Sequence, residues 1–168
     1  MEQERFRELT MLGHWHSMEA ELGDLVPLLP RIVHVCVEVG EGGYDEEQLM
    51  SLGYRLRNLD DAADTALAAA QRGPRQFHVA LWILYPMIGE ERTTAWLSDL
   101  VDVLVAALPS LADCSVAMLA LCRVAMSTTN DTVRERAVCR LRSALDDDAT
   151  DTRYVEPQIR MALAFVGA

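Results

Sequence analysis

Apolar residues recur at steps of three and four over most of the chain, which is the spacing typical of amphipathic α-helices. The longest such stretch covers residues 45–71, where Asp45 can cap the N-terminus and Gln48 follows three residues later. Gly73 and Pro74 are expected to end this helix, because glycine followed by proline is typical of helix C-termini. The pattern predicts one long helix with a heptad-like seam formed by Leu49, Leu52, Leu56, Leu59, Ala63, Ala66 and Ala70.

Residues 77–89 are apolar on every side except at His78, so we expect a helix that other helices surround. Pro86 should bend or close its last turn, and this helix is the best candidate for the centre of the core. Further helices are predicted at residues 96–108, 114–126 and 155–166, and another is expected to begin after a cap at Asn130 or Asp131. The core is predicted to contain Leu81, Trp82, Ile83, Leu100, Leu104, Leu119 and Leu141.

Residues 31–39 differ, because valines there alternate with His34, Cys36 and Glu38 in a pattern typical of a strand. A lone strand would have no convincing partner in this chain, so we interpret the segment as a helix. The sequence as a whole predicts an all-α fold in one domain, residues 1–168. We expect a compact multi-helix bundle or a short helical-hairpin repeat of about seven to eight helices.

The net charge of the chain indicates which classes of partner it can bind. The chain has 26 acidic and 15 basic residues, a formal net charge of −11, and every basic residue is an arginine. Such a charge repels phosphate backbones and anionic lipids, so we expect no direct nucleic-acid or membrane partner. The N-terminal segment lacks the apolar core of a signal peptide, and the longest nearly uncharged run, residues 77–89, is too short to span a bilayer. We therefore expect a cytoplasmic protein.

Residues 131–148 place several arginines next to several aspartates. On a helix, Arg136 and Arg140 stand one turn apart while Arg142 lies on another flank, so the arginines form no single basic stripe. Acidic residues outnumber them locally, and phosphate would meet no net positive field. We interpret the stretch as a solvated helix with intrahelical ion pairs rather than as a nucleic-acid-binding helix.

The segment NDTVRERAVCRLRSAL also resembles the second helix of a HEAT-type repeat. Helix starts expected near residues 77, 114 and 154 are 37 and 40 residues apart, close to the period of such repeats. The resemblance implies that the valine packs inward and that the aspartate and arginine tie neighbouring repeats together. The residues that carry it are Asp131, Val133, Arg134, Ala137 and Leu141.

The cysteines show no paired spacing. Cys36, Cys114, Cys122 and Cys139 lie far apart and form no CxxC motif, so the sequence suggests neither a zinc ribbon nor a disulfide framework. We expect buried free thiols, because cysteine is among the residues most often buried.

Residues 13–21 combine two histidines with two glutamates and raise the question of a metal site. His14 and His16 are about 200° apart on a helix and cannot hold one ion together. Helical di-metal sites use paired Glu-x-x-His motifs with further glutamates, and that arrangement is missing. A histidine and a glutamate one turn apart occur only with the histidine first. These pairs are His16 with Glu19, three residues apart, and His34 with Glu38, four residues apart.

We therefore interpret His16 as a partly buried, hydrogen-bonded histidine beside Leu9 and Leu12 on one helix. No phosphate loop, nucleophile elbow or Cys-His arrangement is recognisable. The sequence thus predicts no catalytic, cofactor-binding or metal-ligating residue, and no enzyme activity.

Three functional hypotheses remain open. The first is a non-catalytic protein–protein interaction module, an adaptor or regulator that presents a helical groove or an acidic face. The second is an acidic inhibitor or mimic that blocks a basic, nucleic-acid-binding surface of its target. The third is a helical metal protein or enzyme with a His/Glu site. The partner is expected to be another protein, and a homodimer through residues 45–71 is a further possibility.

Overall fold

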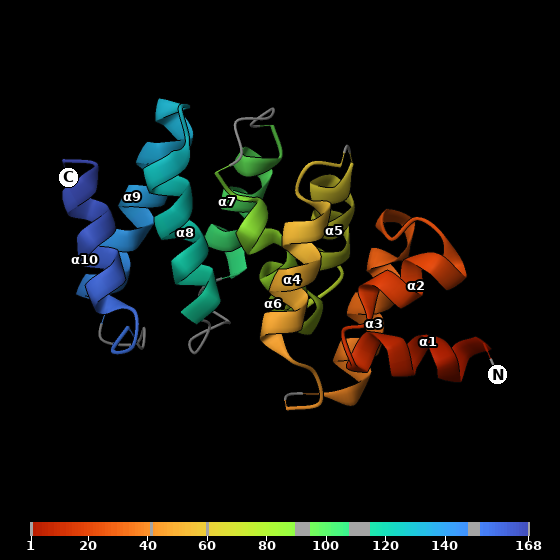
Figure 1. Cartoon of the computed structure of the whole chain (residues 1–168). Coiled ribbons are helices and arrows are strands. Elements are labelled where there is room, and N and C mark those ends of the chain that lie inside the picture. The colour runs from red at the N-terminus through yellow and green to blue at the C-terminus, as the bar shows by residue number, and fades with distance from the viewer. Residues whose placement is uncertain are drawn as a thin grey trace. The chain divides into compact units, whose positions relative to one another are not determined.

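The computed structural model of the chain describes residues 2–40, 42–59, 61–89, 95–107, 115–147 and 152–167. Within these ranges every regular element is helical and there is no strand, so the all-α prediction is confirmed (Figure 1). The 3-10 helices of the described ranges are η1 (Val26–Leu28) and η2 (Tyr85–Met87). The α-helices of the described ranges are α1 (Glu2–Met11), α2 (Trp15–Leu22), α3 (Leu29–Val39), α4 (Glu46–Leu56), α5 (Ala62–Ala70), α6 (Pro74–Leu84), α7 (Ala95–Ala107), α8 (Ser115–Ser127), α9 (Asp131–Asp146) and α10 (Glu156–Phe165).

The prediction of one long helix over residues 45–71 is wrong, because the chain leaves the helical conformation between α4 and α5. Asp61 has a left-handed backbone with φ of 63°, which asparagine and aspartate adopt more easily than most residues. Their side chains also compete with helical hydrogen bonds, so the sequence around Asn58 and Asp61 favours a turn. This break is one reason why the described ranges hold ten α-helices where we predicted seven to eight.

A second break separates α1 from α2. Gly13 has φ of 62°, and a Cβ atom there would lie 2.7 Å from Cβ of Gln48, so the turn needs glycine for both its conformation and its space. His16 consequently lies on a different helix from Leu9, and it is exposed. The prediction of a partly buried His16 is therefore wrong. The buried side chain of this segment is Trp15, whose Nε1 donates to the backbone oxygen of Gln48 at 3.0 Å.

Contacts within the chain group the residues into two compact units, unit 1 (Met1–Met87) and unit 2 (Ile88–Ala168). The single domain over residues 1–168 stays a prediction. None of the helices in the described residues is both long and apolar enough to cross a bilayer.

Unit 1 is built around α6, which packs against α3, α4 and α5. This bears out its predicted place at the centre of a core, and Pro86 lies in η2 at its end as expected. Trp82 is only half-buried, contrary to prediction, and its Nε1 donates to Nε2 of His78 at 3.4 Å on the same flank of the helix. The buried side chains of α6 are Phe77, Val79, Ala80, Leu81, Ile83 and Leu84.

Residues 31–39 belong to α3, which confirms the helical interpretation. The alternating valines did not produce a strand, because Ile32, Val33 and Cys36 are completely or almost completely buried against neighbouring helices. Tertiary packing of a one-sided apolar face here outweighs the strand propensity of β-branched residues.

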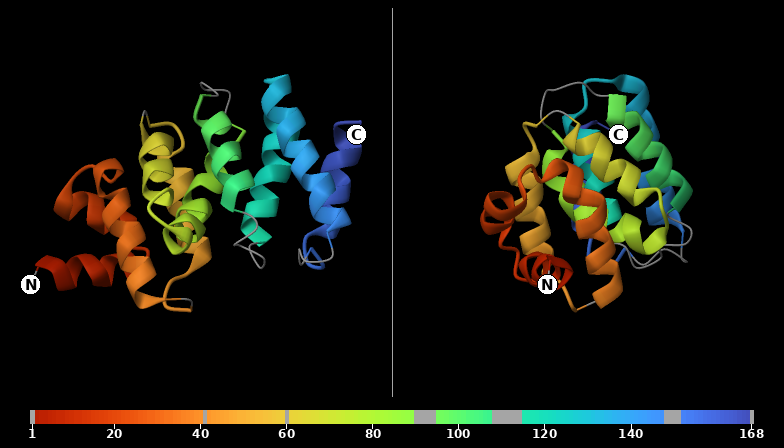
Figure 2. Two further views of the ribbon diagram at one scale, coloured as in Figure 1. Left: turned by 180° about the vertical axis from the view of Figure 1, so that it is seen from behind. Right: turned by 90° about the vertical axis from the view of Figure 1, so that its right-hand side faces the viewer.

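Unit 2 is centred on α8, which contacts α7, α9 and α10 and lies beside α9 and α10 in Figures 1 and 2. Of the predicted core residues in this unit, Leu100, Leu104 and Leu141 are fully buried. Leu119 is only half-buried, because it lies with Ser115 and Arg123 on the side of α8 that faces away from the buried residues. The buried residues of α8 are Val116, Ala117, Met118, Ala120, Leu121, Cys122, Val124 and Ala125.

The arginine-rich helix α9 has a buried apolar side and a charged side. Arg134 pairs with Asp131 at 2.7 Å, which is the expected intrahelical ion pair, and it also donates to the backbone oxygen of Thr128. The ion pair of Arg136 is not intrahelical as predicted, because Arg136 pairs with Asp102 of α7. Val133, Ala137 and Leu141 are buried, so the apolar spacing correctly identified the inner face.

Two cysteines match their predicted environment and one does not. Cys36 and Cys122 are buried free thiols, and loss of solvent raises their pKa to about 12 and about 11. Cys139 is an exposed thiol on α9, so burial was wrongly predicted there. Cys114 lies outside the described residues.

Asn130 caps α9, as predicted, because its Oδ1 accepts from the backbone N–H of Val133 at 3.2 Å. Replacing Asn130 by alanine should lower the free energy of unfolding by about 1 kcal/mol, since an N-terminal donor loses its partner. Asn130→Asp should cost less, because its carboxylate can still accept that bond. Urea denaturation followed by circular dichroism measures both changes. The exposed residue Thr132, replaced by alanine, serves as the control, and equal stability of all three variants would contradict the cap.

Candidate functional site

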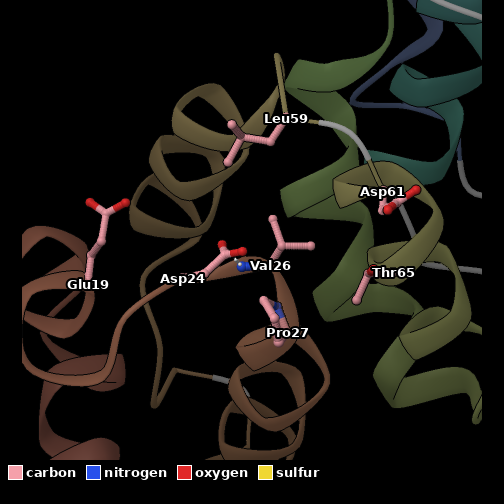
Figure 3. A pocket seen from close by; sticks show the side chains of 7 residues that line it. All are labelled: Glu19, Asp24, Val26, Pro27, Leu59, Asp61 and Thr65. Atoms are coloured by element: carbon pink, nitrogen blue, oxygen red, sulfur yellow. Dashed lines mark hydrogen bonds between the residues drawn. The ribbon is translucent and has the colours of Figure 1, made fainter.

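Unit 1 contains an open hollow of about 690 Å³ between the end of α2, η1 and the α4–α5 turn (Figure 3). It combines three carboxyl groups with apolar side chains and one hydroxyl. The lining residues are Glu19, Asp24, Val26, Pro27, Leu59, Asp61 and Thr65.

The first wall is the segment that joins α2 to η1. Oδ1 of Asp24 accepts from the backbone N–H of Val26 at 3.0 Å, which fixes a tight turn directly after α2. Pro27 lies in the first turn of η1, where its ring restricts the backbone and where the missing N–H is not needed for a hydrogen bond. The turn therefore presents the Asp24 carboxyl group and the Pro27 ring next to each other.

The opposite wall is the turn between α4 and α5. Leu59 remains 48% exposed after α4 has ended, so its side chain contributes an apolar surface rather than core packing. The left-handed Asp61 begins α5, and its carbonyl oxygen accepts from the N–H of Thr65 at 2.9 Å. Figure 3 shows Val26 and Pro27 between Asp24 and Asp61 in this view.

The electrostatics of the hollow are negative. Glu19 pairs with Arg55 of α4, which offsets one of the three carboxylate charges. Asp24 and Asp61 are both exposed, and neither forms an ion pair with another described residue. Neither charge is therefore neutralised by a described side chain, and both carboxylates can attract a cationic group on either side of the apolar surface.

The residues that sequence patterns had singled out lie elsewhere or serve other contacts. Glu19 enters the hollow, but its neighbour in the sequence motif, Glu21, pairs with Arg5 at 2.9 Å. That hydrogen bond lowers the pKa of Glu21 below its usual value. His14 and His16 are exposed, and His34 pairs with Glu38 at 3.4 Å on α3.

The described residues hold no group of three or more histidine, cysteine, aspartate or glutamate side chains placed to hold a metal ion. The carboxylates of the hollow come from three separate segments around an open space, which suits a cationic side chain better than a small ion. A long arginine or lysine side chain could lay its aliphatic stem on Leu59 and Pro27 and direct its charge to a carboxylate.

Asp24, Asp61 and Thr65 were not recognised from the sequence, and Leu59 was assigned only to the seam of the predicted long helix. Both turns carry a local signal, because glycine, asparagine and aspartate gather between apolar-spaced segments. What brings the two turns together is the packing of α3 against α5 and of η1 against α5, which no local pattern encodes.

Comparison of the chain with protein-family models, curated proteins and solved structures found no match. The seven lining residues include no histidine, cysteine or lysine, and Thr65 supplies the one side-chain hydroxyl. The arrangement is chemically suited to recognition through charge and apolar contact.

Proposed function

We propose that the chain is a non-catalytic interaction module whose acidic hollow binds an arginine- or lysine-containing segment of another protein. The observation that carries this proposal is that Asp24 and Asp61, which have no ion-pair partner among the described residues, lie beside the apolar surface of Leu59 and Pro27. Charge-assisted hydrogen bonds give such a contact its orientation, and burial of the aliphatic stem contributes affinity. An adaptor or regulator in the cytoplasm fits this chemistry.

The helical arrangement supports a scaffold role. In unit 2, α8 packs against the following α9, while α8 also contacts α10 and α7 contacts α9. Pairing of successive helices together with contacts between alternate helices is typical of stacked helical hairpins. We therefore propose the helical-hairpin repeat rather than the closed bundle as the finer description of the fold, in line with the HEAT-type resemblance of α9.

An acidic mimic that blocks a basic, nucleic-acid-binding surface is the second proposal, and the net charge of −11 favours it. The two proposals differ in their dependence on salt. Binding by a charge mimic should weaken steeply as ionic strength rises, because it rests on many exposed charges. Binding in the hollow should retain the part that comes from apolar contact.

Neutralising the hollow tests the first proposal. Asp24→Asn combined with Asp61→Asn should weaken binding of a short fluorescent peptide of arginine and leucine by about tenfold, since each exposed ion pair contributes up to about 1 kcal/mol. Asparagine at position 24 can still accept from the N–H of Val26, and asparagine tolerates the left-handed backbone at position 61. Fluorescence anisotropy measures the affinity of the folded variant.

The matched control is Asp99→Asn combined with Glu135→Gln, which removes the same charge from exposed positions of unit 2. A peptide with glutamate in place of arginine should not bind to any variant. Equal weakening by both double variants would favour the charge mimic, because net charge would then matter more than position. No binding of the arginine peptide to the unmodified protein would contradict the proposed hollow.

A further inference from the structure

The C-terminal helix α10 has two apolar faces. One face is buried in unit 2 through Ile159, Ala162 and Leu163. The other lies in solvent, where Tyr154 just before the helix is 83% exposed, Met161 is 59% exposed and Phe165 is 70% exposed. An amphipathic helix that serves only its own core presents polar residues on its outer side, so this second face calls for a partner.

The exposed residues share one side of the helix. Met161 and Phe165 are one turn apart, and Pro157 stands one turn before Met161, so the three follow one another along the surface. All three are exposed, as is Ala164 beside them. The face is therefore a continuous apolar strip about three turns long with Tyr154 at its start.

The charge of the residues around this strip indicates which partner can pack against it. Residues 152–167 contain Arg153, Glu156 and Arg160 as their charged groups, a net charge of +1 within a chain of net charge −11. Two copies of the chain repel each other over most of their surface, but they can meet here without bringing like charges together. Glu156 and Arg160 lie on one flank of the strip, where Nε of Arg160 is 2.7 Å from Oε1 of Glu156.

The order of residues along α10 is complementary to itself when a second helix runs antiparallel. Pro157 and Met161 each lie two residues from Ile159, so a two-fold axis at that level places Pro157 of each copy opposite Met161 of the other. The same axis brings Tyr154 level with Phe165 of the second copy to within one residue.

The charged residues Glu156 and Arg160 also fit this two-fold axis. Glu156 and Arg160 are centred on Gln158, one residue from that axis, so each glutamate comes close to the arginine of the other copy on the same flank. Apolar residues thus face apolar residues, and opposite charges face each other.

We propose that α10 forms a two-fold, antiparallel contact with α10 of a second copy of this chain. A strip three turns long buries less surface than a standard interface, so the dimer should be weak, with a dissociation constant on the order of micromolar or higher. Its formation is independent of the acidic hollow, which lies in unit 1.

Sedimentation velocity of the full chain over a concentration series tests the contact. The unmodified protein should shift from monomer to dimer as concentration rises, whereas Met161→Glu combined with Phe165→Glu should stay monomeric at least tenfold higher in concentration. The control is Leu12→Glu combined with Leu22→Glu, which adds the same charge at exposed apolar positions of unit 1 and should dimerise with only the small loss due to its added charge. Circular dichroism confirms that each variant is folded.

Exchange of the flanking charges tests the antiparallel register. Arg160→Glu alone places glutamates opposite each other and should weaken the dimer, while Glu156→Arg combined with Arg160→Glu exchanges the two signs and should restore it. A monomer at every concentration, or a dimer that survives Met161→Glu with Phe165→Glu, would overturn the proposal. If Glu156→Arg combined with Arg160→Glu dimerised no more tightly than Arg160→Glu alone, the antiparallel register would be overturned.

Discussion

Replacing Gly53 by alanine should destabilise unit 1 by about 2 to 3 kcal/mol, although alanine is normally the better helix former. Gly53 is buried in α4, where the backbone of that helix approaches the end of α6 and η2. A Cβ atom at this position would overlap the carbonyl oxygen of Ile83 and lie 2.5 Å from Cγ of Pro86. Because one obstacle is backbone and the other a rigid ring, the helices would have to move apart.

Urea denaturation followed by circular dichroism measures this loss. The matched control is Ser51→Ala, which makes a small substitution at an exposed position of the same helix and should change stability by no more than about 0.5 kcal/mol. If Gly53→Ala were as stable as the control, the close approach of α4 to η2 would be wrong.

The helices that the sequence predicted well are those whose ends carry strong local signals. Pro109 follows the apolar run of α7, Asn130 caps α9 and Pro157 stands in the first turn of α10. For α3, burial of its apolar face decided against a strand. For α7, α9 and α10 local chemistry and tertiary packing favour the same structure, whereas in α3 packing outweighed the local strand pattern.

The two helix breaks that were missed lie where the apolar period continues through a change in the backbone. Leucines at three- and four-residue steps reach Leu59, yet α4 ends at Leu56 and Leu59 lies in solvent. Similarly, Gly13 interrupts a period that would have joined α1 to α2. Periodicity records which side chains could share a face, whereas the backbone decides where helices are separated: Gly13, with positive φ, lies between α1 and α2, and Asp61, with positive φ, directly precedes α5.

The hollow could not be predicted for a related reason. Asp24 and Asp61 are separated by three elements of unit 1, η1, α3 and α4, and they line one space because η1 and α3 pack against α5. A charge count indicates that acidic groups are numerous, but it does not say which of them lack an arginine partner. That distinction depends on contacts such as the pairing of Glu19 with Arg55.

The break between α4 and α5 divides the seam of the predicted long helix, so two leucines of that seam have opposite environments. Leu52 is fully buried within unit 1, whereas Leu59 is 48% exposed beside the hollow. Leu52→Glu should therefore cost about 4 kcal/mol or more, because it places an unpaired carboxyl group among apolar side chains. Leu59→Glu should change stability by no more than about 0.5 kcal/mol, since water still reaches that position.

Circular dichroism during urea denaturation, with sedimentation of the same samples, distinguishes the possibilities. Loss of the cooperative transition in Leu52→Glu together with a stable Leu59→Glu would show that Leu52 serves the chain's own core. A folded monomer from Leu52→Glu, prepared from a protein that otherwise dimerises, would instead place the seam between two copies and support the homodimer through residues 45–71. Because the two substitutions add the same group to the same residue type, burial is the difference that the comparison measures.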